Sequence, residues 1–231
     1  MRAEVHVAAL GELIERLRSD VTSEADRAYA GHREFSIAIP GGSVVPALEA
    51  VPLDWERSHV FWVDERAVPP GSRDSNFGLA WKLWLEPAKP NPAAVHRMPA
   101  DEPDLQAAAT AYGDEIVRVL GPAPQLDVVL LGVGPDGHVA SLFPGHPALS
   151  ETRELVLPIV DSPRPPPHRL TLTLPMLTGA RRLIVMALGE SKAAVMQEAI
   201  ERTDSSLPVS LVLGRSQRAL VLLDEDAGAR L

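Results

Sequence analysis

The feature that most constrains the fold is an apolar run that ends in a glycine-rich turn. Val128–Leu131 is apolar throughout, which is typical of a strand buried on both faces of a parallel sheet. The turn Gly132–Gly137 follows with three glycines and Asp136, and His138 comes next. Ligands of open α/β sheets bind beyond the carboxyl ends of strands. The turn is therefore a candidate ligand site, where glycines admit a substrate close to the backbone and His138 can act as a general base.

Two alternatives compete for this stretch. Its three glycines match the spacing of the dinucleotide-binding fingerprint, and Asp161 ends the next apolar run. That fingerprint needs a long helix after its last glycine, whereas Pro144 and Pro147 limit any helix here to about two or three turns. A nicotinamide or flavin site is therefore disfavoured. The second alternative makes His138 a hydrogen-bonded structural residue, but the neighbouring aspartate and glycines favour a functional one.

Composition narrows the class of protein. The 231 residues are 45% hydrophobic, which suits one α/β domain over 1–231 or two small ones. The absence of cysteine excludes disulfides and thiolate chemistry and fits a reducing compartment. A net charge of -9 argues against nucleic-acid binding, but not against a small anionic substrate. No apolar run approaches the ~20 residues of a membrane span, and the first residues lack a signal-peptide core. We therefore expect a cytoplasmic protein without a membrane partner.

Strands and helices are predicted to alternate along the chain. Helical spacing of apolar residues predicts helices over 10–30 and 104–120, and shorter helices over 44–51 (with Ser43 near the N-cap), 77–84, 189–200 and 208–213. Strands are predicted at 5–7, 35–39, 58–63, 128–131, 155–160, 169–175, 183–188 and 219–223, and the proline-rich segment 86–103 is predicted to be irregular. This alternation predicts a single three-layer α/β/α domain with a largely parallel, Rossmann-like sheet.

Other polar groups also lie at predicted element ends. Gly41-Gly42-Ser43 follows a strand and precedes a helix, as in a phosphate cradle. Asp64-Glu65-Arg66 follows the next strand. Charged side chains near a core are costly unless they are paired or serve a function, so these residues are either part of a functional site or a surface ion pair. Lys192 lies in the first turn of a helix, where a cation is unfavourable unless a bound anion or solvent compensates it. Arg169 and His168 stand at the start of a strand.

Six motifs in order along nearly the whole chain resemble the 6-phosphogluconolactonase family. They are Gly41–Ser43, Trp62–Pro69, Asp74–Asn76, Gly132–Gly145, Arg169–Pro175 and Gly189–Lys192. The chain departs from the family pattern at Val44-Val45, where Thr-Pro is usual after Gly-Gly-Ser. This departure removes one hydroxyl that could contact phosphate.

The resemblance implies hydrolysis of 6-phospho-D-glucono-1,5-lactone to 6-phosphogluconate, without metal or organic cofactor. It assigns the base to His138, with Asp136 or Asp64 orienting the base or binding sugar hydroxyls. Amides of the glycine turn or Arg66 would stabilise the oxyanion. The predicted catalytic residues are His138, Asp136, Asp64 and Arg66. The predicted substrate-binding residues are Gly41, Gly42, Ser43, Gly137, Arg169 and Lys192. Among these, Arg169, Lys192 and the Gly41–Ser43 loop would bind the phosphate. The expected partner is the small-molecule lactone, bound by a monomer.

Other functions fit the motifs less well. Aminosugar-phosphate isomerase-deaminases resemble the same fold, but carry Phe-Asn-Glu-Pro-Gly after Asp-Gly-His, whereas Ala140–Gly145 contains no carboxylate. This chain also has Arg66 directly after Asp64-Glu65, which favours the lactonase family. A sugar-phosphate sensor in a transcriptional regulator would need a helix-turn-helix segment, which this acidic chain lacks. A serine esterase is disfavoured because no Gly-x-Ser-x-Gly elbow occurs, and a metallohydrolase because the seven histidines never fall two or four residues apart.

Overall fold

A seven-stranded parallel sheet organises the molecule in the computed structural model, which describes residues 3–231. Met1 and Arg2, which belong to the predicted domain, lie outside the described residues. The strands are β1 (Glu4–Val7), β2 (Phe35–Ile39), β3 (Ser58–Trp62), β5 (Val95–His96), β6 (Val128–Leu131), β9 (Arg182–Ala187) and β10 (Ala219–Leu223). Their order is β1-β10-β9-β6-β2-β3-β5, and every neighbouring pair is parallel. Amino ends therefore meet at one edge of the sheet, and carboxyl ends meet at the other.

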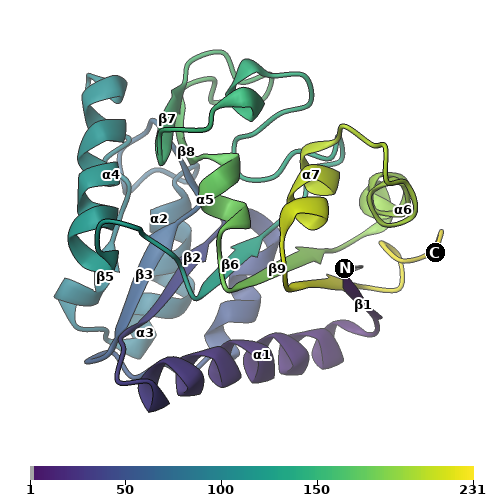
Figure 1. Cartoon of the computed structure of the whole chain (residues 1–231), viewed down its shortest axis with the longest axis horizontal. Helices are drawn as coiled ribbons and strands as arrows, with labels where there is room; N and C mark the ends of the chain where they lie inside the picture. Colours follow the sequence, from purple (N-terminus) through teal and green to yellow (C-terminus); the bar gives the residue numbers. More distant parts are fainter. Residues whose placement is uncertain (1–2) are drawn as a thin grey trace.

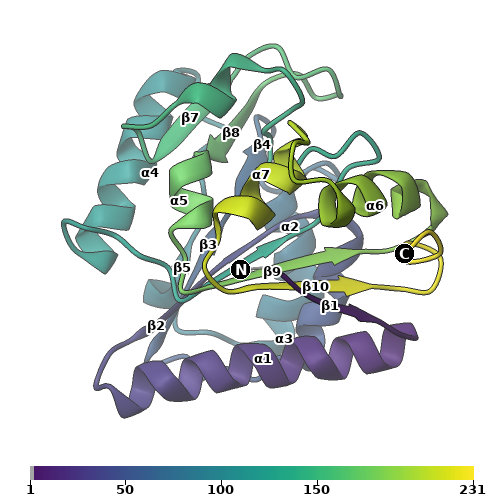
Figure 2. The ribbon, with the colours of Figure 1, turned by 45° about the vertical axis from the view of Figure 1, so that its right-hand side comes forward.

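Helices cover both faces of this sheet. The helical elements are α1 (Leu10–Ala30), α2 (Asn76–Ala80), the π-helical turn η2 (Trp81–Leu85), α3 (Glu86–Ala88), α4 (Leu105–Leu120), α5 (Leu174–Thr178), α6 (Ala193–Glu201) and α7 (Pro208–Arg215). Helix α1 runs along one face and buries Leu13, Leu17 and Val21 against it, whereas α5, α6 and α7 lie over the opposite face (Figures 1 and 2). The predicted three-layer α/β/α fold is confirmed.

The strands of the large sheet are buried as their apolar runs predict. Every residue of β2, β6, β9 and β10 is buried, so these strands contribute both faces to the core. Tyr112 of α4 closes one end of the core, because its hydroxyl accepts from the Trp62 amide at 3.0 Å and donates to the His96 carbonyl at 2.9 Å. Among the described residues, no helix combines the length and the apolar character needed to cross a bilayer.

A second, antiparallel sheet stands beside the first. It contains β4 (Asp64–Arg66), β8 (Arg169–Leu172) and β7 (Val156–Ile159) in that order, and α4 packs on β7 and β8. The sequence predicted β7 and β8 but not their antiparallel pairing. In the register of the small sheet, Arg66 lies opposite Arg169. Residues more than a hundred positions apart are thereby brought to one place.

Three predicted elements differ in the structure. The segment expected to be a helix over 44–51 is the 3₁₀ helix η1 (Gly42–Ala50), and Gly41 rather than Ser43 is its N-cap. Pro46 has no N–H to donate to the Gly42 carbonyl, so an α-helical bond cannot form there. The strand predicted over 169–175 ends at Leu172, because α5 begins at Leu174 with Pro175 in its first turn. The supposedly irregular segment 86–103 contains β5, whose two residues are too few to show an alternating pattern.

Candidate active site

A cavity of about 410 Å³ lies at the carboxyl edge of the large sheet. It is lined by residues that follow β2, β3, β6 and β9, together with residues of the small sheet and its loops. Eight predicted site residues line it: Gly41, Gly42, Ser43, Asp64, Arg66, His138, Arg169 and Lys192. Asp136 and Gly137 do not line it, although both lie in the turn that carries His138.

His138 is held in one orientation by its neighbours. Its Nδ1 lies 2.6 Å from Asp136 Oδ1, and its ring packs on Phe143 with centroids 4.7 Å apart. A Cβ on Gly134 would lie 2.0 Å from His138 Nδ1, so only glycine leaves room for the ring there. Asp136 rather than Asp64 therefore contacts the histidine. Nε2 makes no hydrogen bond to any residue of 3–231 and is the nitrogen left for the cavity.

The protonation states of this pair suit a base. Burial lowers the pKa of His138, and this outweighs the hydrogen bond and charge of Asp136, which act to raise it. Burial alone would raise the pKa of Asp136, but the hydrogen bond and charge of His138 and the charge of Arg164 hold it below its usual value. Near neutral pH the carboxylate is therefore ionised and the imidazole neutral. With Asp136 accepting from Nδ1–H, Nε2 carries the free lone pair.

Gly137 has a local role in the turn. Its φ of +81° is a left-handed conformation that favours glycine. Its N–H donates to the Gly134 carbonyl at 2.9 Å, and its carbonyl accepts from the Val209 amide at 3.0 Å. Both backbone groups are thus engaged within the protein, and the residue shapes the turn that presents His138.

The segment Asp64–Arg66 divides its side chains between two faces, as a strand does. Asp64 and Arg66 line the cavity, whereas Glu65 is buried on the other face. Glu65 accepts hydrogen bonds from the amides of Arg66, Asn76 and Phe77, each at 2.7 Å, and from the Ser75 hydroxyl. Glu65 therefore ties β4 to the start of α2 and fixes the position of its two neighbours.

Asp64 is itself fixed by three side chains. Its Oδ2 accepts from the Ser141 hydroxyl at 2.6 Å and lies 3.9 Å from Arg169 Nη1, while its Oδ1 accepts from Asn76 Nδ2 at 3.1 Å. A Cβ on Gly41 would lie 1.8 Å from Asn76 Oδ1, so glycine is required where the β2 loop meets α2. The Gly41–Ser43 loop, Asn76 and Asp64 consequently form one continuous wall of the cavity.

Arg169 lines the cavity but has few donors left for a ligand. It is 3% exposed; its Nε donates to the Pro166 carbonyl, and its Nη2 donates to the carbonyls of Arg164 and Pro165. Its Nη1 donates to Ser141 Oγ at 3.3 Å. Four of the five N–H groups of the guanidinium are therefore occupied, and a bidentate grip on phosphate would have to break some of these bonds.

Comparison with known proteins gives the family of the chain. The sequence profile described as glucosamine-6-phosphate isomerases/6-phosphogluconolactonase matches residues 9–221. The chain belongs to this family. It is 37% identical to the 6-phosphogluconolactonase of Streptomyces coelicolor, over 97% of this chain and 89% of that one. It is 38% identical to the human 6-phosphogluconolactonase, over 95% and 90% of the two chains. The structure of the 6-phosphogluconolactonase from Trypanosoma brucei superposes with a TM-score of 0.87 at 28% identity, covering 100% and 99% of the two chains.

In this member of the family, Arg164 also lines the cavity, and the sequence analysis had not singled it out. Its Nη2 lies 3.4 Å from Asp136 Oδ1, and its carbonyl is one of those held by Arg169. The sequence signal for Arg164 is its place in a stiff, proline-rich loop just before a predicted strand. Lys192 stands nearby: burial and the charge of Arg164 lower its pKa, and Asp136 opposes that change.

Two arginines of this chain have a buried side-chain nitrogen that lacks a hydrogen-bond acceptor. The Nε atoms of Arg66 and Arg164 are buried without a hydrogen-bond partner among residues 3–231. A buried guanidinium N–H without an acceptor is costly, and both side chains line the same cavity. Because these Nε atoms are shielded from solvent, a ligand in the cavity would meet the other nitrogens of the two guanidinium groups. Over the same residues, no group of three or more histidines and carboxylates is arranged to hold a metal ion.

Proposed function

We propose that this protein is an enzyme that hydrolyses 6-phospho-D-glucono-1,5-lactone to 6-phospho-D-gluconate, in the pentose phosphate pathway. The observation that carries the proposal is a single cavity that combines an aspartate-oriented, neutral histidine with the cationic side chains of Arg66, Arg164 and Lys192. A phosphorylated lactone needs these two things: a base for the attacking water, and cations for the phosphate and the developing oxyanion.

His138 acts as the general base. Its Nε2 takes a proton from water as the water oxygen attacks the lactone carbonyl, and Asp136 stabilises the imidazolium that forms. The carbon–oxygen bond to the ring oxygen then breaks, and the imidazolium returns the proton to that oxygen. A positioned base contributes typically ~10²–10⁴-fold to such a step. Asp64 lies on the cavity wall, where its remaining acceptor capacity suits a sugar hydroxyl.

Arg66 stabilises the charge that appears on the carbonyl oxygen. Its Nη1 is fixed by the Asp74 carbonyl at 2.8 Å, so the guanidinium is held in place before the substrate arrives. Donors that need no reorganisation are the effective ones at an oxyanion, and each contributes about 10²–10³-fold. The amides at the start of the Gly132–Gly137 turn lie along the same wall.

The phosphate binds to Lys192, Arg164 and the first amides of η1. The lysine supplies a point charge, the arginine supplies its terminal nitrogens, and the amides of Gly42 and Ser43, at the start of η1, have no acceptor within the helix. Arg169 acts indirectly, because its bonds to the carbonyls of 164–166 hold the loop that carries Arg164. The direct phosphate contact expected of Arg169 stays a prediction, for which its Nη1 keeps one N–H.

We also infer a monomeric, cytoplasmic enzyme that works without metal or organic cofactor as one domain over 1–231. Exposed large apolar side chains are scattered over several elements, as in most monomers. A doubly charged sugar phosphate does not cross membranes unaided, so an enzyme that consumes it works in the compartment where it is made. Light scattering of the purified protein tests the monomer, since a dimer would double the mass.

The reaction is tested with freshly generated lactone. The rate of product formation, corrected for spontaneous hydrolysis, should rise in proportion to enzyme concentration. Glucosamine 6-phosphate serves as the control substrate, and no ammonia should be released from it. Ammonia release without lactone hydrolysis would replace the proposed reaction by a deaminase activity.

A further inference from the structure

A second cavity lies at the amino edge of the large sheet, opposite the candidate active site. It has a volume of about 440 Å³ and is formed where β2, β6, β9 and β10 begin, between the end of α1, the end of α5 and the end of α7. Strand β9 has six residues between the two edges, so about 20 Å separates this cavity from the catalytic one. None of its lining residues is used in the proposed reaction.

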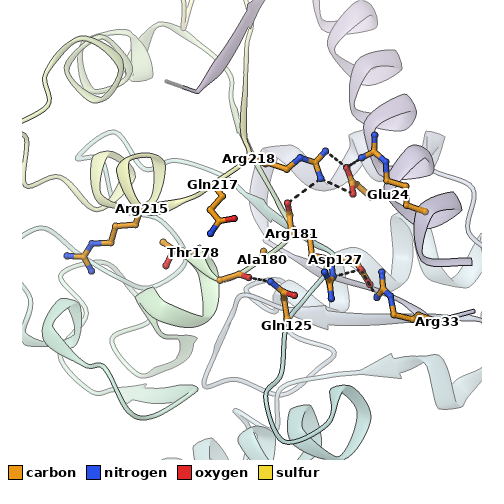
Figure 3. Close-up of a pocket in the computed structure, with 12 residues that line it drawn as sticks. Glu24, Arg33, Gln125, Asp127, Thr178, Ala180, Arg181, Arg215, Gln217 and Arg218 are labelled. Atoms are coloured by element: carbon orange, nitrogen blue, oxygen red, sulfur yellow. Dashed lines mark hydrogen bonds and ion pairs between the residues drawn. The ribbon is translucent and has the colours of Figure 1, made fainter. Parts of the chain in front are cut away.

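The cavity is built around two buried carboxylates that each hold two arginines. Asp127 is 1% exposed and lies 3.0 Å from Arg33 Nη1 and 3.3 Å from Arg181 Nε. Glu24 accepts from Arg218 Nη2 at 2.7 Å and also from Arg27. Figure 3 shows Arg218 beside Glu24, and Arg33 and Arg181 beside Asp127, with Gln217 and Thr178 to one side of both groups and Arg215 pointing away. The carboxylates therefore fix four guanidinium groups around one space.

These arginines keep donors for a ligand. Their side chains are 42–58% exposed, whereas the two carboxylates are buried behind them. Arg33 contacts Asp127 through Nη1 alone, and Arg181 contacts it through Nε alone, so their other N–H groups have no partner among residues 3–231. Gln217 and Thr178 add neutral polar groups suited to hydroxyls. The cavity thus offers several unshared guanidinium N–H groups in a fixed arrangement.

The net charge of this cavity differs from that of an ordinary ion-pair cluster. Five arginines and two carboxylates line it, which gives a net charge of +3 on a chain whose net charge is -9. A neighbouring cluster at the same edge provides the contrast: Arg182 is 9% exposed and pairs with both Asp20 and Glu4, which also pair with Arg16, so that charges balance. Structural ion pairs need such balance, because excess like charge is destabilising. The half-exposed arginines of the cavity carry an excess of positive charge that a bound anion can neutralise.

We propose that this amino-edge cavity is a binding site for a small, multiply charged oxyanion, such as a phosphorylated or polycarboxylate metabolite. Guanidinium groups fixed by carboxylates bind such groups through paired, charge-assisted hydrogen bonds. The cavity volume accommodates a ligand of that size. Binding here is independent of the reaction at the other edge of the sheet.

Binding is tested by calorimetric titration with pyrophosphate and, separately, with citrate, at low ionic strength. The protein carries Arg164→Gln and Lys192→Gln, which remove the proposed phosphate contacts at the catalytic edge. We expect one saturable site with a Kd below about 1 mM for at least one of the two probes. Preference for pyrophosphate indicates a phosphate ligand, and preference for citrate indicates a polycarboxylate. Absence of saturable binding of both probes overturns the proposal.

Variants then locate the site. Adding Arg181→Gln and Arg218→Gln should weaken binding at least ~10-fold, whereas the charge-matched control Arg153→Gln with Arg202→Gln should leave it within about twofold. Gln217→Glu keeps both arginine pairs and their folding contacts, and should still weaken binding ~3–10-fold by adding one negative charge. Unchanged affinity in these cavity variants, or an equal loss in the control, overturns the assignment. Circular dichroism confirms that each variant is folded.

Discussion

The two edges of the same parallel sheet both gather arginines, but the arginines are partnered in opposite ways. At the carboxyl edge, Arg66 and Arg164 each keep a buried Nε without an acceptor. At the amino edge, Arg33 and Arg181 share the buried Asp127, and their unused N–H groups face outward. Positive charge alone therefore does not distinguish a site of reaction from a site of binding.

The difference lies in what the carboxylates do. Asp136 at the carboxyl edge is bound to a titratable imidazole, so its charge sets the state of a base. Asp127 at the amino edge accepts from the Ser36 amide and hydroxyl as well as from arginine, so its charge joins β2 to β6. The catalytic edge depends on protonation, and the amino edge depends on fixed charge. Substitutions should therefore change turnover at one edge, and stability or anion affinity at the other.

The largest expected effect is at the base. His138→Ala should lower kcat by ~10²–10⁴-fold with little change in KM, because the phosphate contacts remain. His168→Ala is the matched control, since His168 is an exposed histidine outside the cavity, and it should keep wild-type turnover. Initial rates are compared after subtraction of spontaneous hydrolysis. Wild-type turnover in His138→Ala would remove the histidine from the mechanism.

Asp136→Asn should lower kcat by ~10²-fold or more, because an amide can donate to Nδ1 and place the imidazole proton on Nε2. The pH profile sharpens this prediction. Burial lowers the pKa of His138, so wild-type activity should persist to more acidic pH than a free imidazole would allow, and should fall once the imidazole becomes protonated. Asp136 acts to raise that pKa, so its loss should move the acid limb to lower pH. Asp161→Asn, which alters the exposed pair with His146, should leave both measurements unchanged.

Lys192→Gln and Arg164→Gln should each raise KM by ~10–100-fold and change kcat less, because each removes a charge-assisted bond to the phosphate. Steady-state kinetics with the lactone provide the measurement. Lys82→Gln, at an exposed lysine, is the control for charge. A wild-type KM in both cavity variants would show that the phosphate binds to other residues.

At the amino edge, Asp127→Asn should act on stability. Its carboxylate accepts from the amide and the hydroxyl of Ser36 at 3.0 and 3.1 Å, while its arginine partners are half-exposed and contribute little. The free energy of unfolding should fall by about 2–3 kcal/mol in urea titrations, and kcat of the folded protein should not change. Asp204→Asn, in an exposed pair, should change stability by less than about 0.5 kcal/mol. A lower kcat of the fully folded Asp127→Asn protein would contradict the claim that the amino edge does not affect turnover.

The smallest expected effect is that of a chelator. His138 with Asp136 supplies the proton transfer, and arginine with lysine supplies the positive charge, so the proposed reaction needs no ion. Incubation with EDTA followed by gel filtration should leave kcat within the error of the assay. Inactivation that added divalent metal reverses would contradict this expectation.

The sequence predicted the large sheet well because its strands are marked by local patterns. The limits of β2, β6 and β10 and of α1 agree with those expected, since each is a continuous apolar run or a long helical stripe. The small sheet was not predicted as a sheet. The alternation in 169–172 indicates a strand but carries no information on its partner, and β4 is only three residues long.

The catalytic cavity was predicted more fully than the arginine cavity, for a physical reason. Seven of the eight predicted site residues in the cavity follow predicted strands of the parallel sheet, whose carboxyl ends must meet, so they could be placed together from the order of elements. Arg169 instead starts a strand, and the family resemblance placed it there. Arg164 was missed because the surrounding prolines dominated the interpretation of its loop. The amino-edge contacts join residues far apart in sequence, such as Arg33 and Asp127, and no short motif marks such a pairing.

The pairing of β1 with β10 bears on how the chain folds during synthesis. Glu4 lies opposite Leu220, and Val7 lies opposite Leu223. Strand β1 therefore has no strand to pair with until β10 has been synthesised. Closure of that side of the sheet waits for β10, and such long-range pairing is slow to form. Until then the nascent chain carries an unpaired strand that chaperones or neighbouring chains can bind.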